Sequence, residues 1–165
     1  MKVALDTNCF IDVNNPNSST YSSLSKIFEL ANKGKIELYI SRHTLDELSK
    51  KPDRAYALAK TITILSYWPV GSWDDLVGTW KDLTGTWDDI GRNNLIKEEI
   101  KNLAKSGTSI RDQGAYIDSL HSKIEFFITS DKKMAKSNPA KRLYERFGLK
   151  VITPKEVCDK FFNYV

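Results

Sequence analysis

This chain has few of the residues that bind soft metals or form disulfide bonds. It contains two cysteines, Cys9 and Cys158, and two histidines, His43 and His121, among 165 residues. None of them stands in the paired CxxC or HxxxH spacing of a zinc site, so the sequence argues against zinc. The two cysteines are consistent with a reducing compartment, and we expect both to be free, buried thiols.

The chain also lacks a long hydrophobic run. No apolar stretch approaches the length of a membrane span, and Met1-Lys2-Val3 leads into a strand-like segment without the apolar core of a signal peptide. We therefore expect a cytoplasmic protein with no membrane segment. A length of 165 residues with 41% hydrophobic content suits one buried core, so we expect a single domain over 1–165.

Strand-like and helix-like segments alternate along most of the chain. The predicted strands are 2–6, 36–40, 125–129 and 149–152, and the predicted helices are 20–33, 42–50, 53–66, 92–105, 110–122, 138–146 and 154–163. This alternation favours an α/β fold, a three-layer α/β/α sandwich with a mainly parallel central sheet. Three boundaries have local causes, because Ser41 can cap a helix, Gly148 can end one and Pro154 suits a first turn.

Four acidic residues stand at the ends of short apolar segments. They are Asp6, Glu47, Asp112 and Asp131. Asp6 and Asp131 each follow a strand-like run, at the carboxyl end of a predicted parallel strand, where open α/β sheets bind ligands. A carboxylate beside a buried strand needs a partner, and oxygen ligands are those that Mg²⁺ and Mn²⁺ prefer. The sequence therefore predicts a site for one of these cations.

The same acids and their surroundings resemble the PIN-domain family. Asp6-Thr7-Asn8 is similar to the family's opening Asp-Thr-Asn/Ser motif, and Thr129-Ser130-Asp131 is similar to its closing Thr-x-Asp motif. Ile40-Ser41 followed by Glu47 resembles its passage from the second strand into a helix, and Asp112 opens a helix-like stretch as the third acid does. The resemblance covers nearly the whole chain. It implies a PIN-like fold whose four acids bind Mg²⁺ or Mn²⁺ and hydrolyse phosphodiester bonds in RNA.

A small PIN protein without further modules resembles the VapC-like toxins of type II toxin–antitoxin pairs. That resemblance implies an endoribonuclease whose partners are RNA and an antitoxin protein. Two alternatives stay open: a non-toxin RNA-processing or structure-specific DNA nuclease, and a non-catalytic binding module with a PIN-like fold. A homodimer also stays open.

The third and second acids each have a rival. Asp118 lies six residues beyond Asp112 in the same predicted helix, about 120° around it, so one metal ion would not contact both. The family spacing favours Asp112. Asp46 is a weaker rival of Glu47. Polar neighbours of the acids are predicted to orient them or the substrate, and these are Thr7, Asn8, Thr129 and Ser130.

The formal net charge of +4 indicates where a polyanion could bind. Basic residues follow two of the acids directly, with Lys50 and Lys51 after Glu47 and with Lys132 and Lys133 after Asp131. Such residues can steer a phosphate backbone toward the acids, and a solvated helix face is the alternative interpretation.

A seven-residue repeat separates the second and third acids and is the chain's clearest departure from the family pattern. It spaces Trp73, Trp80 and Trp87 evenly within an insertion at about 70–91. On a helix these tryptophans would form one stripe, although the repeated glycines weaken a helix. We favour a helical or irregular segment that covers the domain's own core. A docking surface for a partner or a second copy, and stacking on bases, are the alternatives.

Overall fold

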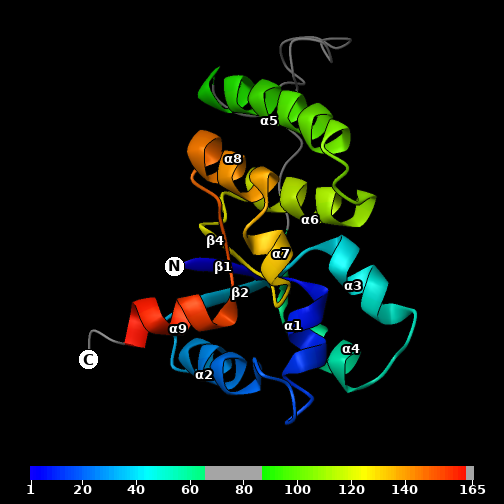
Figure 1. The fold of residues 1–165 in the computed structure, drawn as a ribbon, viewed down its shortest axis with the longest axis vertical. Coiled ribbons are helices and arrows are strands. Elements are labelled where there is room, and N and C mark those ends of the chain that lie inside the picture. Colours follow the sequence, from blue (N-terminus) through cyan, green and yellow to red (C-terminus); the bar gives the residue numbers. More distant parts are fainter. Residues whose placement is uncertain (66–86, 163–165) are drawn as a thin grey trace.

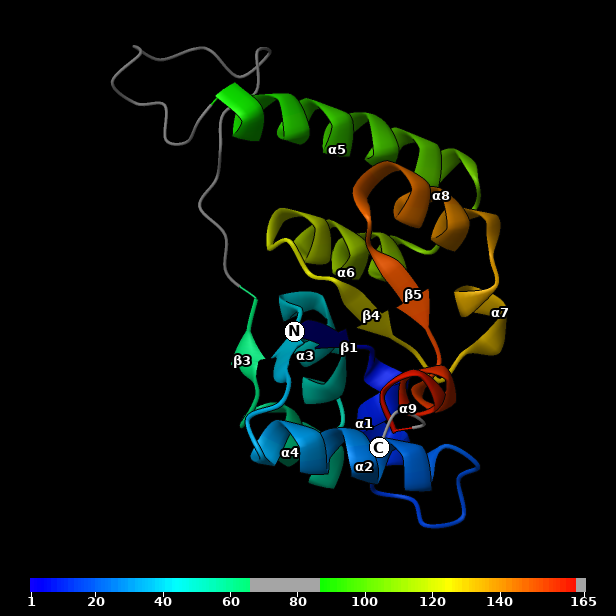
Figure 2. The same ribbon diagram turned by 90° about the vertical axis from the view of Figure 1, so that its left-hand side faces the viewer.

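A parallel sheet lies at the centre of this computed structural model, which describes residues 1–65 and 87–162 (Figure 1). In those residues five strands pair in the order β3-β2-β1-β4-β5, and every neighbouring pair is parallel (Figure 2). The strands are β1 (Lys2–Leu5), β2 (Glu37–Ile40), β3 (Thr63–Ile64), β4 (Phe126–Ile128) and β5 (Lys150–Ile152). The predicted α/β class with a parallel central sheet is confirmed.

Helices cover both faces of this sheet. One layer contains α1 (Thr7–Asp12), α2 (Tyr21–Asn32), α4 (Arg54–Ala59) and α9 (Pro154–Phe162). The opposite layer contains α5 (Trp87–Lys105), α6 (Ile110–His121) and α8 (Asn138–Phe147). Two further helices, α3 (Arg42–Ser49) and α7 (Lys132–Ala135), follow the second and fourth strands. Figure 1 shows the first layer below the sheet and the second above it, which is the predicted three-layer arrangement.

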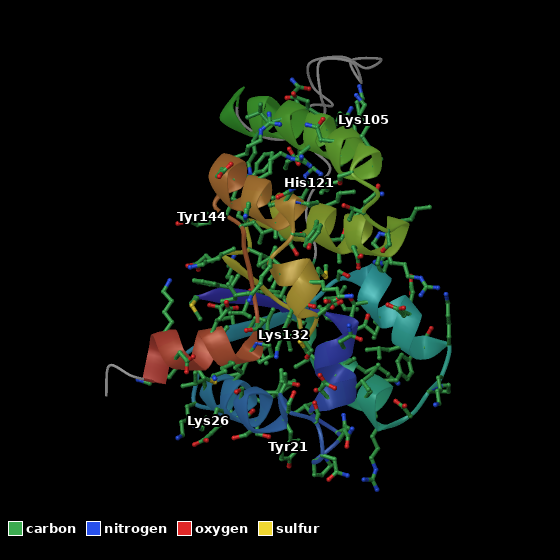
Figure 3. The ribbon with its side chains drawn as sticks, viewed as in Figure 1. Tyr21, Lys26, Lys105, His121, Lys132 and Tyr144 are labelled. Atoms are coloured by element: carbon green, nitrogen blue, oxygen red, sulfur yellow. The ribbon has the colours of Figure 1, made fainter. Side chains whose placement is uncertain are left out.

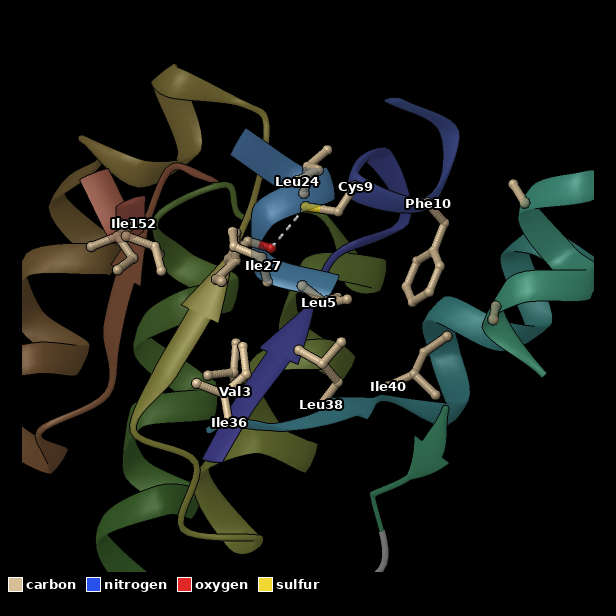
Figure 4. Close-up of a cluster of buried hydrophobic side chains, with 14 of the residues drawn as sticks. Val3, Leu5, Cys9, Phe10, Leu24, Ile27, Ile36, Leu38, Ile40 and Ile152 are labelled. Atoms are coloured by element: carbon tan, nitrogen blue, oxygen red, sulfur yellow. Dashed lines mark hydrogen bonds between the residues drawn. The ribbon is translucent and has the colours of Figure 1, made fainter. Parts of the chain in front are cut away.

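Alternating side chains on the strands separate two hydrophobic cores. In β1, Val3 and Leu5 pack with Phe10 in the core between the sheet and helices α1 and α2 (Figure 4). Ala4 packs in the other core, between the sheet and helices α5 and α6. Successive residues of a strand point to opposite faces, so a strand covered on both faces must be apolar throughout. This explains why the strand segments read as uninterrupted apolar runs.

Local capping sets three of the predicted boundaries. The hydroxyl of Ser41 accepts a hydrogen bond from the backbone N–H of Thr44 at 3.0 Å and so caps α3. Gly148 closes α8 in the left-handed conformation, with φ of 74°, which glycine adopts without a Cβ clash. Pro154 is the first residue of α9. These three predictions are confirmed.

The predicted helix 53–66 is wrong in its second half. The observed helix α4 ends at Ala59, and β3 follows at Thr63–Ile64 as the edge strand beside β2. The segment 61–64 reads Thr-Ile-Thr-Ile, and β-branched side chains lose rotamer freedom in a helix but fit a pleated sheet. Pairing with β2 therefore prevails over continuation of the helix.

Two short helices, α1 and α7, were not predicted. Each begins directly after an acid, with Asp6 as the cap residue of α1 and Asp131 as the cap residue of α7. The residues of α1 are weak helix formers, and this helix is held by the burial of Cys9 and Phe10, whereas α7 consists of strong helix formers but spans only four residues. Each of these helices places an acid of the predicted site at a helix N-terminus.

The helix α5 begins at Trp87, earlier than the predicted 92–105. Buried Glu99 joins it to α8, since Arg142 Nε donates to Glu99 Oε1 at 2.5 Å and Arg146 Nη1 donates to Glu99 Oε2 at 3.0 Å. Trp73 and Trp80 lie outside the described residues, so the interpretation of the repeat stays a prediction. Within residues 1–65 and 87–162, no helix combines the length and apolar character needed to cross a membrane.

Candidate active site

The four predicted acids line one open pocket at the carboxyl ends of β1 and β4. These strands are neighbours, with Leu5 opposite Ile128, so the chain segments that follow them emerge side by side. The backbone N–H of Asp6 donates to the carbonyl of Ile128 at 2.9 Å and holds the two strand ends together. The pocket has a volume of about 440 Å³. The acids that line it are Asp6, Glu47, Asp112 and Asp131.

Asp6 is the most buried of these acids, with 8% of its surface exposed. The backbone N–H of Thr7 donates to its Oδ1 at 2.8 Å, and the hydroxyl of Thr129 donates to its Oδ2 at 2.7 Å. Burial, with a smaller contribution from the charges of Asp112 and Glu47, raises the pKa of the Asp6 carboxyl from its ordinary 3.8 to about 6, although the two hydrogen bonds act to lower it. The ionised carboxylate therefore lacks a sufficient counter-charge.

Thr129 connects two of the acids. Its hydroxyl is fully buried, donates to Asp6 and accepts a hydrogen bond from the backbone N–H of Asp131 at 3.1 Å. The threonine thereby fixes the Asp6 carboxylate relative to the turn that carries Asp131. Thr129 was predicted to orient an acid or the substrate, and the carboxylate that it contacts is that of Asp6.

Glu47 reaches the pocket from α3 and has both carboxylate oxygens engaged. The hydroxyl of Thr7 donates to Oε2 at 2.7 Å, and Arg111 Nη1 donates to Oε1 at 2.7 Å. Arg111 is largely exposed and lines the same pocket. An ion pair this open to solvent is weak, about 0–1 kcal/mol, so a cation in the pocket could displace it.

Asp112 and Asp131 both lie at helix N-termini. Asp112 is in the first turn of α6, whose cap residue Ser109 accepts a hydrogen bond from the Asp112 backbone at 3.1 Å. Asp131 caps α7, and its Oδ1 accepts from the backbone N–H groups of Lys133 and Met134. Unpaired N–H groups and the helix dipole favour negative charge at such ends, so both helices help to gather carboxylates at the pocket.

Asp118, the rival for the third position, lies away from the pocket. Its side chain is 9% exposed and accepts a hydrogen bond from the backbone N–H of Arg42, the first residue of α3. Burial raises its pKa, and the charge of His43 acts against that shift. Asp118 therefore supports the packing of α6 on α3, which is the helix that carries Glu47. Asp46 is exposed on α3 and does not line the pocket.

The remaining predicted neighbours differ in their positions. Thr7 contacts Glu47, and Asn8 lines the pocket. The hydroxyl of Ser130 lies 4.0 Å from the sulfur of Cys9, which donates to the carbonyl of Ile128 (Figure 4). Burial raises the pKa of the Cys9 thiol, so it remains protonated and has no nucleophilic role here. Cys9 and Cys158 are both free and buried, as predicted.

The carboxylate oxygens of the four acids are suitable ligands for a hard divalent cation. In this structure, however, the four side chains do not converge closely enough to coordinate one. Among the described residues, no three His, Cys, Asp or Glu side chains are close enough to hold a metal ion as they stand. Glu47 is held by Arg111, and Asp131 by its own helix. The residues that would hold Mg²⁺ or Mn²⁺ are the four carboxylates, and burial together with the charges of Asp112 and Glu47 raises the pKa of Asp6, so a bound cation would favour its ionised form.

Basic side chains border the acids only in part. Lys51 and Arg111 line the pocket, and Lys132 begins α7 directly after Asp131 (Figure 3). Lys50, Lys132 and Lys133 do not line this pocket. The predicted attraction of a polyanion to the pocket therefore depends on only a few basic side chains, chiefly Lys51 and Arg111.

Sequence reasoning missed Arg111 and Tyr116. Arg111 precedes Asp112 directly, but its partner Glu47 is 64 residues away, and no local pattern predicts that pairing. Tyr116 stands four residues after Asp112, on the same face of α6, and a 3.6-residue period could have identified it. Burial and the charges of nearby acids raise the pKa of its hydroxyl.

Comparison with known proteins supports the fold. No protein-family model matches the chain, and no curated protein matches its sequence. Among solved structures, the chain is similar to one described as VapBC2 from Rickettsia felis bound to a DNA fragment from their promoter. The match covers 93% of this chain and 98% of that chain, with a TM-score of 0.51 and 14% sequence identity. At this identity the likeness concerns the fold, and the parallel sheet flanked by helices is consistent with a PIN-like fold.

Proposed function

We propose that this protein is a Mg²⁺- or Mn²⁺-dependent endoribonuclease that hydrolyses phosphodiester bonds in RNA. The observation that carries the proposal is the convergence of four acids from separate segments on one open pocket. Carboxylates that lie close together repel one another, and Asp6 is buried as well. Without a bound ligand these acids therefore destabilise the folded state. A bound cation and a phosphate group would remove that repulsion.

The roles of the side chains follow from their contacts. A bound Mg²⁺ or Mn²⁺ supplies positive charge that activates water and stabilises the charge developing on the phosphate. Asp6, Glu47, Asp112 and Asp131 would hold the ion directly or through water. Thr129 keeps the Asp6 carboxylate in place, since its hydroxyl also accepts from the Asp131 backbone.

Arg111 has a role that depends on Glu47. While Arg111 occupies Glu47 Oε1, that oxygen cannot bind a cation. Release of the ion pair would free the carboxylate and leave the guanidinium at the pocket, where it can donate two hydrogen bonds to a phosphate. Glu47 would then be paired with the cation and Arg111 with the phosphate, so both side-chain charges would stay compensated.

We further propose that the protein acts in the cytoplasm as the toxin of a type II toxin–antitoxin pair. The likeness in fold to VapBC2 and the motifs shared with small PIN proteins support this proposal. Its partner would be an antitoxin protein that covers the acid pocket. The state of the chain as a monomer or a homodimer stays a prediction.

Cleavage of labelled RNA by purified protein in Mn²⁺ tests the proposed reaction. Glu47→Gln removes a pocket carboxylate, and Asp46→Asn is its matched control because Asp46 is exposed on the same helix outside the pocket. We expect cleavage by the wild type and by Asp46→Asn, and loss of cleavage by roughly 100-fold or more in Glu47→Gln. Addition of EDTA should abolish the reaction.

The substrate panel separates the alternatives. Single-stranded RNA, duplex RNA and the matching DNA strands are each incubated with the wild type. Cleavage of DNA in preference to RNA would favour a DNA nuclease. Cleavage of none of them, together with Mn²⁺ binding that is equal in Glu47→Gln and the wild type, would favour a non-catalytic module.

A further inference from the structure

A second pocket lies beside the acid pocket and is not explained by metal binding. It is formed by the loop between α5 and α6, the face of α6, and the segment from α7 to the start of α8. Its volume is about 380 Å³, within the range of roughly 300–1,000 Å³ that small-ligand sites occupy. It shares Asp112 and Asp131, as well as Ser109 and Met134, with the acid pocket, so the two pockets adjoin.

Tyr116 lines this second pocket and has an unsatisfied hydroxyl. The residue is 1% exposed, and its hydroxyl oxygen has no hydrogen-bond partner among the described residues. The ring itself is well placed, packing edge-on against Phe127 with a centroid separation of 5.2 Å. A phenylalanine would pack equally well without leaving a buried polar group unpaired. The presence of the hydroxyl is therefore evidence that a ligand pairs with it.

The other polar groups of the pocket are mostly in use. Ser109 caps α6 and Ser137 caps α8, and the Ser137 hydroxyl also donates to the carbonyl of Met134 at 2.7 Å. Lys133 differs, because its ammonium group makes no hydrogen bond or ion pair with a residue in the described part of the chain. The pocket is thus lined by Tyr116, whose buried hydroxyl has no partner among the described residues, and by Lys133, which is exposed.

We propose that this pocket holds the sugar–phosphate of the nucleotide next to the scissile bond of single-stranded RNA. The proposal rests on the proposed ribonuclease function. Lys133 contacts the phosphate, and Tyr116 donates to an oxygen of the same sugar–phosphate unit. A strand whose scissile phosphate lies at the acids must continue past Asp112 or Asp131, and the second pocket adjoins both. Lys133 also offsets the repulsion between that phosphate and the two carboxylates.

Steady-state cleavage of an oligoribonucleotide by matched variants tests this inference. Tyr116→Phe is paired with Tyr39→Phe, which removes a hydroxyl that donates to Glu37 outside both pockets. Lys133→Gln is paired with Lys136→Gln, an exposed lysine directly after α7 that lines neither pocket. We expect the KM to rise roughly 3–10-fold in Tyr116→Phe and in Lys133→Gln, with little change in kcat, and both controls to match the wild type.

Substrate length and salt supply two further readouts. Shortening the RNA from one end should remove the sensitivity to Tyr116→Phe once the neighbouring nucleotide is gone, while shortening from the other end should not. In Lys133→Gln, the slope of the logarithm of the RNA-binding constant against the logarithm of the salt concentration should become shallower. The change should be about that expected for the loss of one phosphate contact. The melting temperature of Tyr116→Phe should equal or exceed that of the wild type, which separates loss of binding from loss of folding.

The outcomes distinguish this inference from the proposed function. Unchanged KM in Tyr116→Phe, or equal effects of Lys133→Gln and Lys136→Gln, would overturn the second pocket while leaving the ribonuclease intact. A wild type that cleaves no RNA in Mn²⁺ would overturn both proposals.

Discussion

Replacement of Asp6 by asparagine should stabilise the metal-free protein at neutral pH. The pKa of Asp6 rises from 3.8 to about 6 on folding, and one pKa unit corresponds to about 1.4 kcal/mol, so ionisation of this carboxyl destabilises the folded state by roughly 3 kcal/mol. Asparagine has one acceptor oxygen, whereas Asp6 accepts from both Thr7 and Thr129, and the mismatched hydrogen bond costs about 1 kcal/mol. The expected net gain is about 2 kcal/mol.

The sign of this effect determines its dependence on pH. Well below pH 4 the carboxyl is protonated in both the folded and the unfolded chain, so its raised pKa has no consequence for stability. As the pH rises, the unfolded chain loses the proton first, and folding is progressively disfavoured until about pH 7. The variant should therefore match the wild type or fall slightly below it near pH 4, and exceed it in free energy of unfolding at neutral pH.

Urea unfolding of both proteins in EDTA, at a series of pH values, measures the difference. Subtraction of the two curves cancels the other titrating groups, and Asp46→Asn controls for the loss of a carboxylate elsewhere. Mn²⁺ at ten to a hundred times its Kd should then stabilise the wild type by roughly 1.4–2.7 kcal/mol and the variant much less. A difference between variant and wild type that does not change with pH would refute the reasoning about Asp6.

Three further predictions concern contacts around and beyond the pocket. Arg111→Gln should tighten Mn²⁺ binding by roughly 2–5-fold, because it frees Glu47 Oε1 and removes a positive charge; calorimetric titration without RNA measures this, and weaker binding would contradict it. Thr129→Val should destabilise the protein by roughly 1–2 kcal/mol at neutral pH but less near pH 4, because the ionised Asp6 loses a donor; the same urea series tests this, and a larger loss at acid pH would count against it. Glu99→Gln should lower the free energy of unfolding by roughly 2–3 kcal/mol. This loss is smaller than that for a fully buried ion pair because Arg142 and Arg146 are about a third exposed. The KM for RNA should be unchanged.

Much of the fold was predictable because its strands are short apolar runs with clear ends. β1, β2, β4 and β5 were each predicted within a residue or two, since burial on both faces leaves no polar position inside a strand. β3 was missed because two residues beside a helix give no periodic pattern. The short helices α1 and α7 were missed because their caps, Asp6 and Asp131, act through contacts that composition does not reveal.

The candidate site was partly predictable for a geometric reason. Parallel neighbouring strands end at the same edge of a sheet, so the residues that follow β1 and β4 lie near one another, and Asp6 and Asp131 line the same pocket. The helix α6 presents Asp112 to the pocket because Ser109 caps it there. The pairing of Glu47 with Arg111 could not be predicted, since it depends on the distance between α3 and α6 rather than on either sequence.

Two features beside the carboxyl ends of β1 and β4 reduce the stability of the folded chain. The pKa of Asp6 is raised by burial, and the hydroxyl of Tyr116 is buried without a partner among the described residues. Each could be removed by a simple substitution, to asparagine or to phenylalanine, that keeps the surrounding packing. Groups that a fold would be more stable without are typical of functional sites, because binding of a ligand supplies the missing interaction. Under the proposed function a cation would compensate Asp6 and the sugar–phosphate would supply an acceptor for Tyr116, so a metal-bound phosphodiester strand would provide both at adjoining pockets.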